Sequence, residues 1–182
     1  PIYSKVPLTV QDYEGRRVST ISSTENNFEG RMAHESSMYL SINALFILHL
    51  FEKMSCMGVL TEDSLYGYLL TSPAITEFQK DFIKLGIKEY WAGNYVSSIH
   101  ILIPQVERSV RNLAQLLGCV TLKQNRQTGG SDYRTLGSLL NDQLFIERLG
   151  NISPDVAFHL RMLFTDQRGD NLRNDVCHGI SS

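Results

Sequence analysis

The sequence predicts an all-α protein, a bundle of helices with a loop or short β insertion between the longest helix and the C-terminal helices. From residue 31 onward, apolar residues recur every three or four positions, which is the period of an amphipathic helix. The periodic segments end at glycines or at a Ser-Pro pair, which are typical helix boundaries. With 182 residues, the chain is most simply one helical domain, 31–182, preceded by an N-terminal extended or loop segment, 1–30.

The first helix is expected over residues 31–56. Leu45, Leu48 and Phe51 are spaced so that they share one face of this helix. The segment is strongly apolar, but polar and charged residues interrupt it too often for a membrane span. It therefore predicts a helix buried in the core, and no membrane segment is expected in this chain.

Three further helices are expected before residue 118. Thr61 is placed to cap a short helix over 62–70, and two longer helices over 75–91 and 95–117 should form an antiparallel hairpin. Pro104 lies inside the last of these and should kink or break it. The apolar residues expected to mark the buried faces are Phe78, Phe82, Leu85 and Tyr90 in one helix and Val96, Ile99, Ile103, Val106, Val110, Leu113 and Leu117 in the next.

The C-terminal third begins with a short β-like piece at 120–122. One or two short helices are expected over 135–150. Ser-Pro-Asp at 153–155 is typical of a helix start and predicts a helix to residue 164. The residues of this helix expected to be buried are Val156, Ala157, Leu160, Leu163 and Phe164. Arg168 and Gly169 should end that stretch before one last helix.

Composition and charge are those of an ordinary globular domain. The formal net charge of −2 gives no overall electrostatic attraction to nucleic acid, so a surface that binds RNA would have to be local. Three widely spaced cysteines (Cys56, Cys119 and Cys177) without a CxxC pair are typical of reduced thiols and indicate a cytoplasmic protein. The chain begins at Pro1, so we expect a piece of a larger protein whose flanking domains are missing.

The last helix carries the residues that point to function. Asp170 is placed as its N-cap and Gly179 as its stop. Within it, Asn174 and His178 are four apart and share a face, whereas Arg173 and His178 diverge by about 140°. Two copies of this helix across a two-fold axis would bring two arginines and two histidines around one cleft.

The motif Arg173-Asn174-x3-His178-Gly179 resembles the RNxxxHG signature of the DUF4209 family, which is considered HEPN-like. Its core also fits the R-x4–6-H pattern of HEPN domains. Two upstream stretches resemble the same family, AGNYV at 92–96 and PQVERSVRNL at 104–113. The resemblance covers about the C-terminal half of the chain. It implies a HEPN-like helical bundle, a homodimer, and metal-independent cleavage of RNA, with Arg173, His178 and Asn174 in the catalytic site.

In that chemistry the ribose 2′-hydroxyl attacks the neighbouring phosphorus, which gives a 2′,3′-cyclic phosphate. His178 suits the transfer of protons because imidazole titrates near neutral pH. Arg173 suits the stabilisation of a phosphate because guanidinium presents a planar fork of donors. Asn174 could bind the phosphate or orient the imidazole. We expect no metal and no cofactor, since no cluster of ligands is apparent.

Other roles remain open at this stage. Glu107 and Arg111 are four apart on the long helix and form either a simple surface pair or a supporting layer in which Glu107 orients Arg173. Arg173 could instead pair with its neighbouring aspartates. Cys177 is expected to be a small buried residue. The alternative to a nuclease is a catalytically inactive HEPN-like module that mediates dimerisation or protein interaction.

Overall fold

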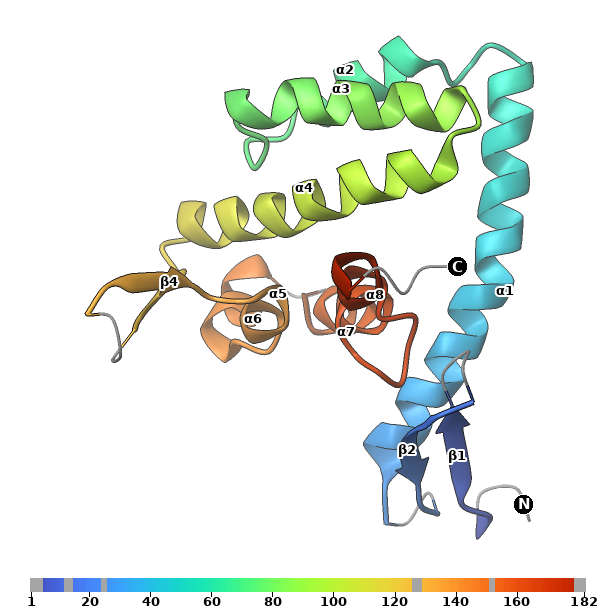
Figure 1. Ribbon diagram of the computed structural model, residues 1–182, viewed down its shortest axis with the longest axis vertical. Helices are drawn as coiled ribbons and strands as arrows, with labels where there is room; N and C mark the ends of the chain where they lie inside the picture. The colour runs from blue at the N-terminus through green and yellow to red at the C-terminus, as the bar shows by residue number, and fades with distance from the viewer. Residues whose placement is uncertain (1–4, 12–14, 24–25, 126–128, 151–152, 179–182) are drawn as a thin grey trace.

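The computed structural model describes residues 5–11, 15–23, 26–125, 129–150 and 153–178. Within these residues the chain is mostly helical, with eight helices and two antiparallel two-stranded hairpins (Figure 1). The elements are β1 (Leu8–Gln11), β2 (Arg17–Ile21), α1 (Phe28–Cys56), α2 (Glu62–Leu70), α3 (Glu77–Trp91), α4 (Tyr95–Leu116), β3 (Leu122–Gln124), β4 (Ser131–Tyr133), α5 (Leu136–Leu140), α6 (Gln143–Leu149), α7 (Ser153–Phe164) and α8 (Leu172–His178). The prediction of a mostly helical protein with a short β insertion between α4 and the C-terminal helices is confirmed, but α4, the helix expected to be the longest, is shorter than α1.

Both hairpins are peripheral. β1 pairs with β2 from Leu8 opposite Ile21 onward, and Ile21 is fully buried. The hairpin of β1 and β2 lies beside the start of α1 (Figure 1). The segment over 1–30 was expected only to be extended or loop, and part of it forms the strand that ends at the buried Ile21. β3 pairs with β4, two residues beyond the expected β-like piece.

Helix boundaries follow their local caps. α2 begins after Thr61, whose hydroxyl accepts from Ser64 N at 3.1 Å, while Ser64 Oγ accepts from Thr61 N at 2.8 Å. α1 starts three residues earlier than expected, because the Asn27 side chain accepts a hydrogen bond from Gly30 N at 2.9 Å. α4 runs through Pro104 without a break, so of the two outcomes expected there, a kink or a break, the break does not occur.

α3 and α4 form the predicted antiparallel hairpin and lie side by side above the C-terminal helices (Figure 1). They approach closely at Gly86, where an added Cβ would lie 2.5 Å from the Leu102 side chain, and Ser98 Oγ donates to Gly86 O at 2.8 Å. The side chain of Gln79 is fully buried between them and bonds Ser109 Oγ at 3.1 Å and Asn112 at 2.8 Å. The helix face that carries Gln79 therefore meets α4.

The predicted apolar face of α3 is turned outward, and so is the first part of the predicted face of α4. Phe78, Phe82 and Leu85 of α3 are 77%, 53% and 46% exposed, whereas Ile83 and Ile87 of the same helix are buried. The expected face was wrong because the small Gly86 selects the side on which α4 can approach. In α4, Val96 and Ile99 are also exposed, and Ile103 is buried as expected.

The core lies between the C-terminal half of α4 and helices α5 to α7. Its buried members are Ala114, Cys119, Leu136, Leu139, Leu140 and Phe145. From α7, Ala157 and Met162 are buried, and Leu160 and Phe164 pack against the cluster as expected. Val156 is 42% exposed, contrary to expectation. This core is the support on which α8 rests, since α8 packs against α4 and α7.

The central part of α1 has no cover within the described residues. Its buried residues lie in its first two turns, where it meets α7, and every residue from 41 to 50 is exposed. Leu45 and Phe46 are 69% and 70% exposed, so the expectation of a buried helix was wrong. Figure 1 shows why: α1 runs along one side of the molecule, across the ends of the other helices. No helix in the described part of the chain is long and apolar enough to cross a membrane.

Candidate functional site around α8

The turn before α8 is held tightly to the end of α7. Asp170 N donates to Met162 O at 2.8 Å, and a Cβ at Gly169 would lie only 2.2 Å from that carbonyl oxygen. Only glycine allows this approach. Burial raises the pKa of the Asp170 carboxyl above its ordinary value.

α8 begins one residue later than predicted. Asn171 precedes the helix with a φ of 49°, and its carbonyl accepts the first helical hydrogen bonds from Asn174 N and Asp175 N. The predicted N-cap, Asp170, was therefore wrong by one position. Asparagine adopts this left-handed conformation more readily than most residues.

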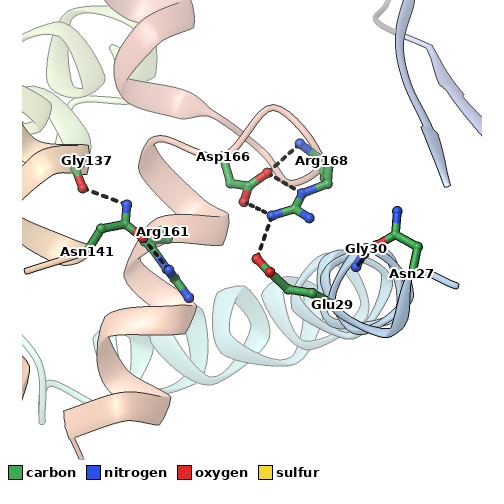
Figure 2. A network of polar contacts seen from close by, with 8 residues as sticks. All are labelled: Asn27, Glu29, Gly30, Gly137, Asn141, Arg161, Asp166 and Arg168. Carbon is green, nitrogen blue, oxygen red and sulfur yellow. Dashed lines mark hydrogen bonds and ion pairs between the residues drawn. The ribbon is translucent and has the colours of Figure 1, made fainter. Parts of the chain in front are cut away.

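A polar cluster fixes the same turn to α1 (Figure 2). Arg168 donates from Nε and from its backbone to Asp166 Oδ1 at 2.9 Å, and from Nη2 to Asp166 Oδ2 at 2.7 Å. The same Nη2 reaches Glu29 in the first turn of α1 at 3.2 Å. Burial opposes ionisation of Asp166, but the bonds from Arg168 outweigh it, so the pKa of Asp166 is lowered. In Figure 2, Arg161 points to Asn141 of the neighbouring α5–α6 turn.

The central contact of the site joins α8 to α4 through Glu107. Arg173 Nε donates to Glu107 Oε2 at 2.9 Å, and Arg111 Nη2 donates to Glu107 Oε1 at 2.8 Å. The three side chains are only 27%, 15% and 17% exposed in the order Arg173, Glu107, Arg111. The hydrogen bond that Arg173 donates to the Glu107 carboxylate raises the pKa of Arg173, which is cationic in any case. Of the two arrangements left open from the sequence, Glu107 therefore makes both contacts at once, with Arg111 and with Arg173.

Asn174 extends this arrangement along α8. Its Oδ1 accepts from Arg173 Nη1 at 3.1 Å, and its Nδ2 donates to Asn171 Oδ1 at 2.7 Å. Asn171 Nδ2 in turn donates to Asp175 Oδ1 at 3.2 Å. The Arg173 guanidinium is thus oriented from two sides, by a carboxylate on α4 and by an amide on its own helix.

Arg173 and Asn174 line a pocket of about 220 Å³ together with Thr135, Gly137 and Thr165. This is smaller than the roughly 300–1,000 Å³ of pockets that bind drug-sized ligands, and it has room for a single charged group such as a phosphodiester. The two threonines were not anticipated, because nothing in their sequence neighbourhood distinguishes them from other loop threonines. The Asn171–Asn174–Asp175 chain was also missed, although its spacing of three and four residues signals contacts along a helix.

His178 is the last residue of α8, and its side chain lies outside the described residues, as does Gly179. The helical backbone puts positions 174 and 178 on the same side of α8. Cys177 is exposed, so the expectation of a buried residue was wrong. Among the residues that the structure describes, no group of three or more His, Cys, Asp or Glu side chains could hold a metal ion.

Comparison of the chain with protein-family models, with curated proteins and with solved structures found no match.

Proposed function

We propose that this protein is a metal-independent endoribonuclease of the HEPN type, acting as a cytoplasmic homodimer. The observation that carries the proposal is the Arg173 guanidinium, held by Glu107 and Asn174 at the edge of a pocket of phosphodiester size. A fixed guanidinium beside such a pocket suits the stabilisation of charge that develops on phosphate oxygens.

In the proposed reaction the ribose 2′-oxygen attacks the adjacent phosphorus and the bond from phosphorus to the 5′-oxygen breaks. His178 takes the proton from the 2′-hydroxyl, and the imidazolium of His178 from the second copy gives a proton to the 5′-oxygen. The products are a 2′,3′-cyclic phosphate and a 5′-hydroxyl, so no water, metal or cofactor is consumed. Arg173 and Asn174 bind the phosphate, and Glu107 and Arg111 position Arg173.

The proposal includes a second copy because positions 173 and 178 lie on different sides of α8. Over a seven-residue helix, positions 173 and 178 point about 140° apart, so one copy of α8 is poorly suited to surround a phosphate. Two copies related by a two-fold axis would supply each site with groups from both.

The test is cleavage of a single-stranded RNA by the purified chain in EDTA, with the ends of the products identified by mass spectrometry. We expect cyclic-phosphate ends, and a loss of rate of about 10²–10⁴-fold for His178→Ala, the range usual for a general acid or base. The matched control is His159→Ala, because His159 is an exposed histidine of α7 whose ring bonds Asp155 O of its own helix. Cleavage by His178→Ala at the wild-type rate would refute the assignment.

A second candidate function, a non-catalytic module that binds a protein partner, is favoured by the surface of α1. Residues 41–50 of this helix are all exposed and mostly apolar. Isolated exposed apolar side chains are common, but a contiguous set of this size marks an interaction surface. Sedimentation of the chain, together with the cleavage assay, separates the two functions: self-association without cleavage favours the module, and a strict monomer that cleaves RNA contradicts the composite site.

A further inference from the structure

A second, larger cavity of about 440 Å³ opens between the start of α3, the middle of α4 and the end of β4. The residues that matter for its chemistry are Phe78, Arg108, Arg111, Asn112, Gln115 and Tyr133. Its size is sufficient for one ring system with an attached charged group.

The cavity is cationic. Two arginines line it, and none of its lining residues is acidic. Arg111 shares the carboxylate of Glu107 with Arg173, so part of its charge is compensated, while the exposed Arg108 adds a further positive charge. Arg111 Nε is also buried without a hydrogen-bond partner among the described residues, and such a donor is costly to leave unpaired. The cavity therefore favours an anionic ligand.

The cavity also presents two bare aromatic rings. Phe78 is 77% exposed and Tyr133 is 60% exposed. Each lies beside an arginine: the Arg108 guanidinium carbon is 5.9 Å from the Phe78 ring centre, and that of Arg111 is 4.8 Å from the Tyr133 ring centre. Exposed rings that alternate with guanidinium groups are the usual surface on which unpaired bases stack while phosphates are neutralised.

The cavity is adjacent to the pocket of Arg173. Arg111 in the cavity and Arg173 in the pocket bond the two oxygens of one carboxylate, Glu107. The end of β4 also connects the cavity to the pocket. Tyr133 lines the cavity, and Thr135, two residues later, lines the pocket. One extended ligand could therefore occupy both.

We propose that this cavity binds one nucleotide of single-stranded RNA next to the bond that is cut. The base stacks on Phe78, the more exposed of the two rings, and Arg108 pairs with its phosphate. The proposal rests on the proposed ribonuclease function for the identity of its ligand. It excludes a preference for double-stranded RNA, whose bases are already stacked and paired.

The experiment is binding of a fluorescein-labelled ten-nucleotide RNA whose riboses are 2′-O-methylated, so that it cannot be cut by attack of the 2′-oxygen. Fluorescence anisotropy is measured over a series of salt concentrations. We expect Phe78→Ala to weaken binding by about five- to 150-fold, the range for loss of one stacked base. For Arg108→Ala we expect weaker binding and a salt dependence whose slope is smaller by about 0.7, which corresponds to one phosphate contact.

Matched controls come from the same helical layer. Lys88→Ala removes an exposed positive charge near the end of α3, and Tyr68→Ala removes a 74% exposed ring from α2. Neither residue lines the cavity, and both variants should bind as the wild type does. Melting temperatures, read by circular dichroism, verify that all four variants are folded.

The outcomes are separable from those of the cleavage assay. If the wild type does not cut RNA, but Arg108→Ala and Phe78→Ala weaken binding and the controls do not, the nuclease proposal falls and the binding site stands. If these two variants lose no more affinity than Lys88→Ala and Tyr68→Ala, or if a duplex binds more tightly than the single strand, the binding site is refuted whether or not RNA is cut.

Discussion

Replacing Glu107 by glutamine should cost the protein a measurable part of its stability. Glu107 accepts hydrogen bonds from two guanidinium groups, at 2.8 Å and 2.9 Å, and its side chain is only 15% exposed. Glutamine keeps one acceptor oxygen but places an NH₂ group against the other arginine, so at least one charge-assisted bond is lost. Such a bond contributes about 1.5–3 kcal/mol, and solvent near Arg173 reduces this, so we expect about 2 kcal/mol.

The assay is thermal unfolding followed by circular dichroism at near-physiological ionic strength. For a chain of this length, a loss of about 2 kcal/mol lowers the melting temperature by about 4–8 °C. The control is Glu77→Gln, since Glu77 pairs with Lys80 at 2.6 Å but is 82% exposed, and such pairs contribute under about 1 kcal/mol. If Glu107→Gln melts no lower than Glu77→Gln, Glu107 does not hold the two arginines as we have argued.

Two further changes test the turn before α8. The raised pKa of Asp170 means that the folded state binds a proton more readily than the unfolded state, so stability should fall as the pH rises from the ordinary value of 3.8 through the folded pKa. Asp170→Asn removes this loss, and at pH 7 it should melt higher than the wild type in the same circular dichroism experiment; a lower melting temperature contradicts the burial. Gly169→Ala forces a methyl group against Met162 O and should cost about 1–3 kcal/mol, seen as a lower midpoint in urea. Gly67→Ala in α2, where an added Cβ would have no packing neighbour within 4 Å, should instead leave stability unchanged or raise it. Equal effects of the two substitutions would count against the close approach of Gly169 to Met162 O.

Helix positions could be predicted from the sequence because their signals are local. Thr61 and the Ser-Pro pair at 72–73 end or begin helices through groups one to three residues away, and α2 was placed correctly at both ends. The strand at Arg17–Ile21 was not located within the expected extended or loop segment, because it forms through its pairing with β1 and ends at Ile21, which is buried only in the folded chain. That strand is determined by contacts with distant residues, which the local sequence pattern does not reveal.

Burial was harder to predict than helicity. The spacing of Leu45, Leu48 and Phe51 correctly indicates a helix, but spacing alone does not say whether another element covers that face. On α3 the larger aromatic residues suggested the buried side, yet the close approach at Gly86 placed Ile83 toward the core. The contact that the small Gly86 permits with α4 therefore decided which face of α3 is buried, although burial of the large aromatic side chains would have removed more apolar surface from water.

The candidate site was predicted in part. A contact between Glu107 and Arg173 was one of two arrangements left open from the sequence. The hydrogen bond between them across 66 residues confirms this contact, though not the roles proposed for them. The threonines of the pocket, Thr135 and Thr165, could not be predicted because they reach it only through the folding of α5 and α7. A sequence motif can identify the charged groups of a site, but the other residues that line the pocket come from elements that carry no motif.

The bare middle of α1 has a consequence for how this chain would respond to a binding partner. Within the described residues no side chain from 41 to 50 is buried, so this stretch relies mainly on its helical hydrogen bonds and can unwind at a free-energy cost well below that of melting the core. A partner that covers residues 41–50 would add packing contacts, so that this stretch would unwind only when the whole domain unfolds. Binding of a partner to α1 should therefore slow hydrogen exchange along the whole helix, including at amides that do not contact the partner.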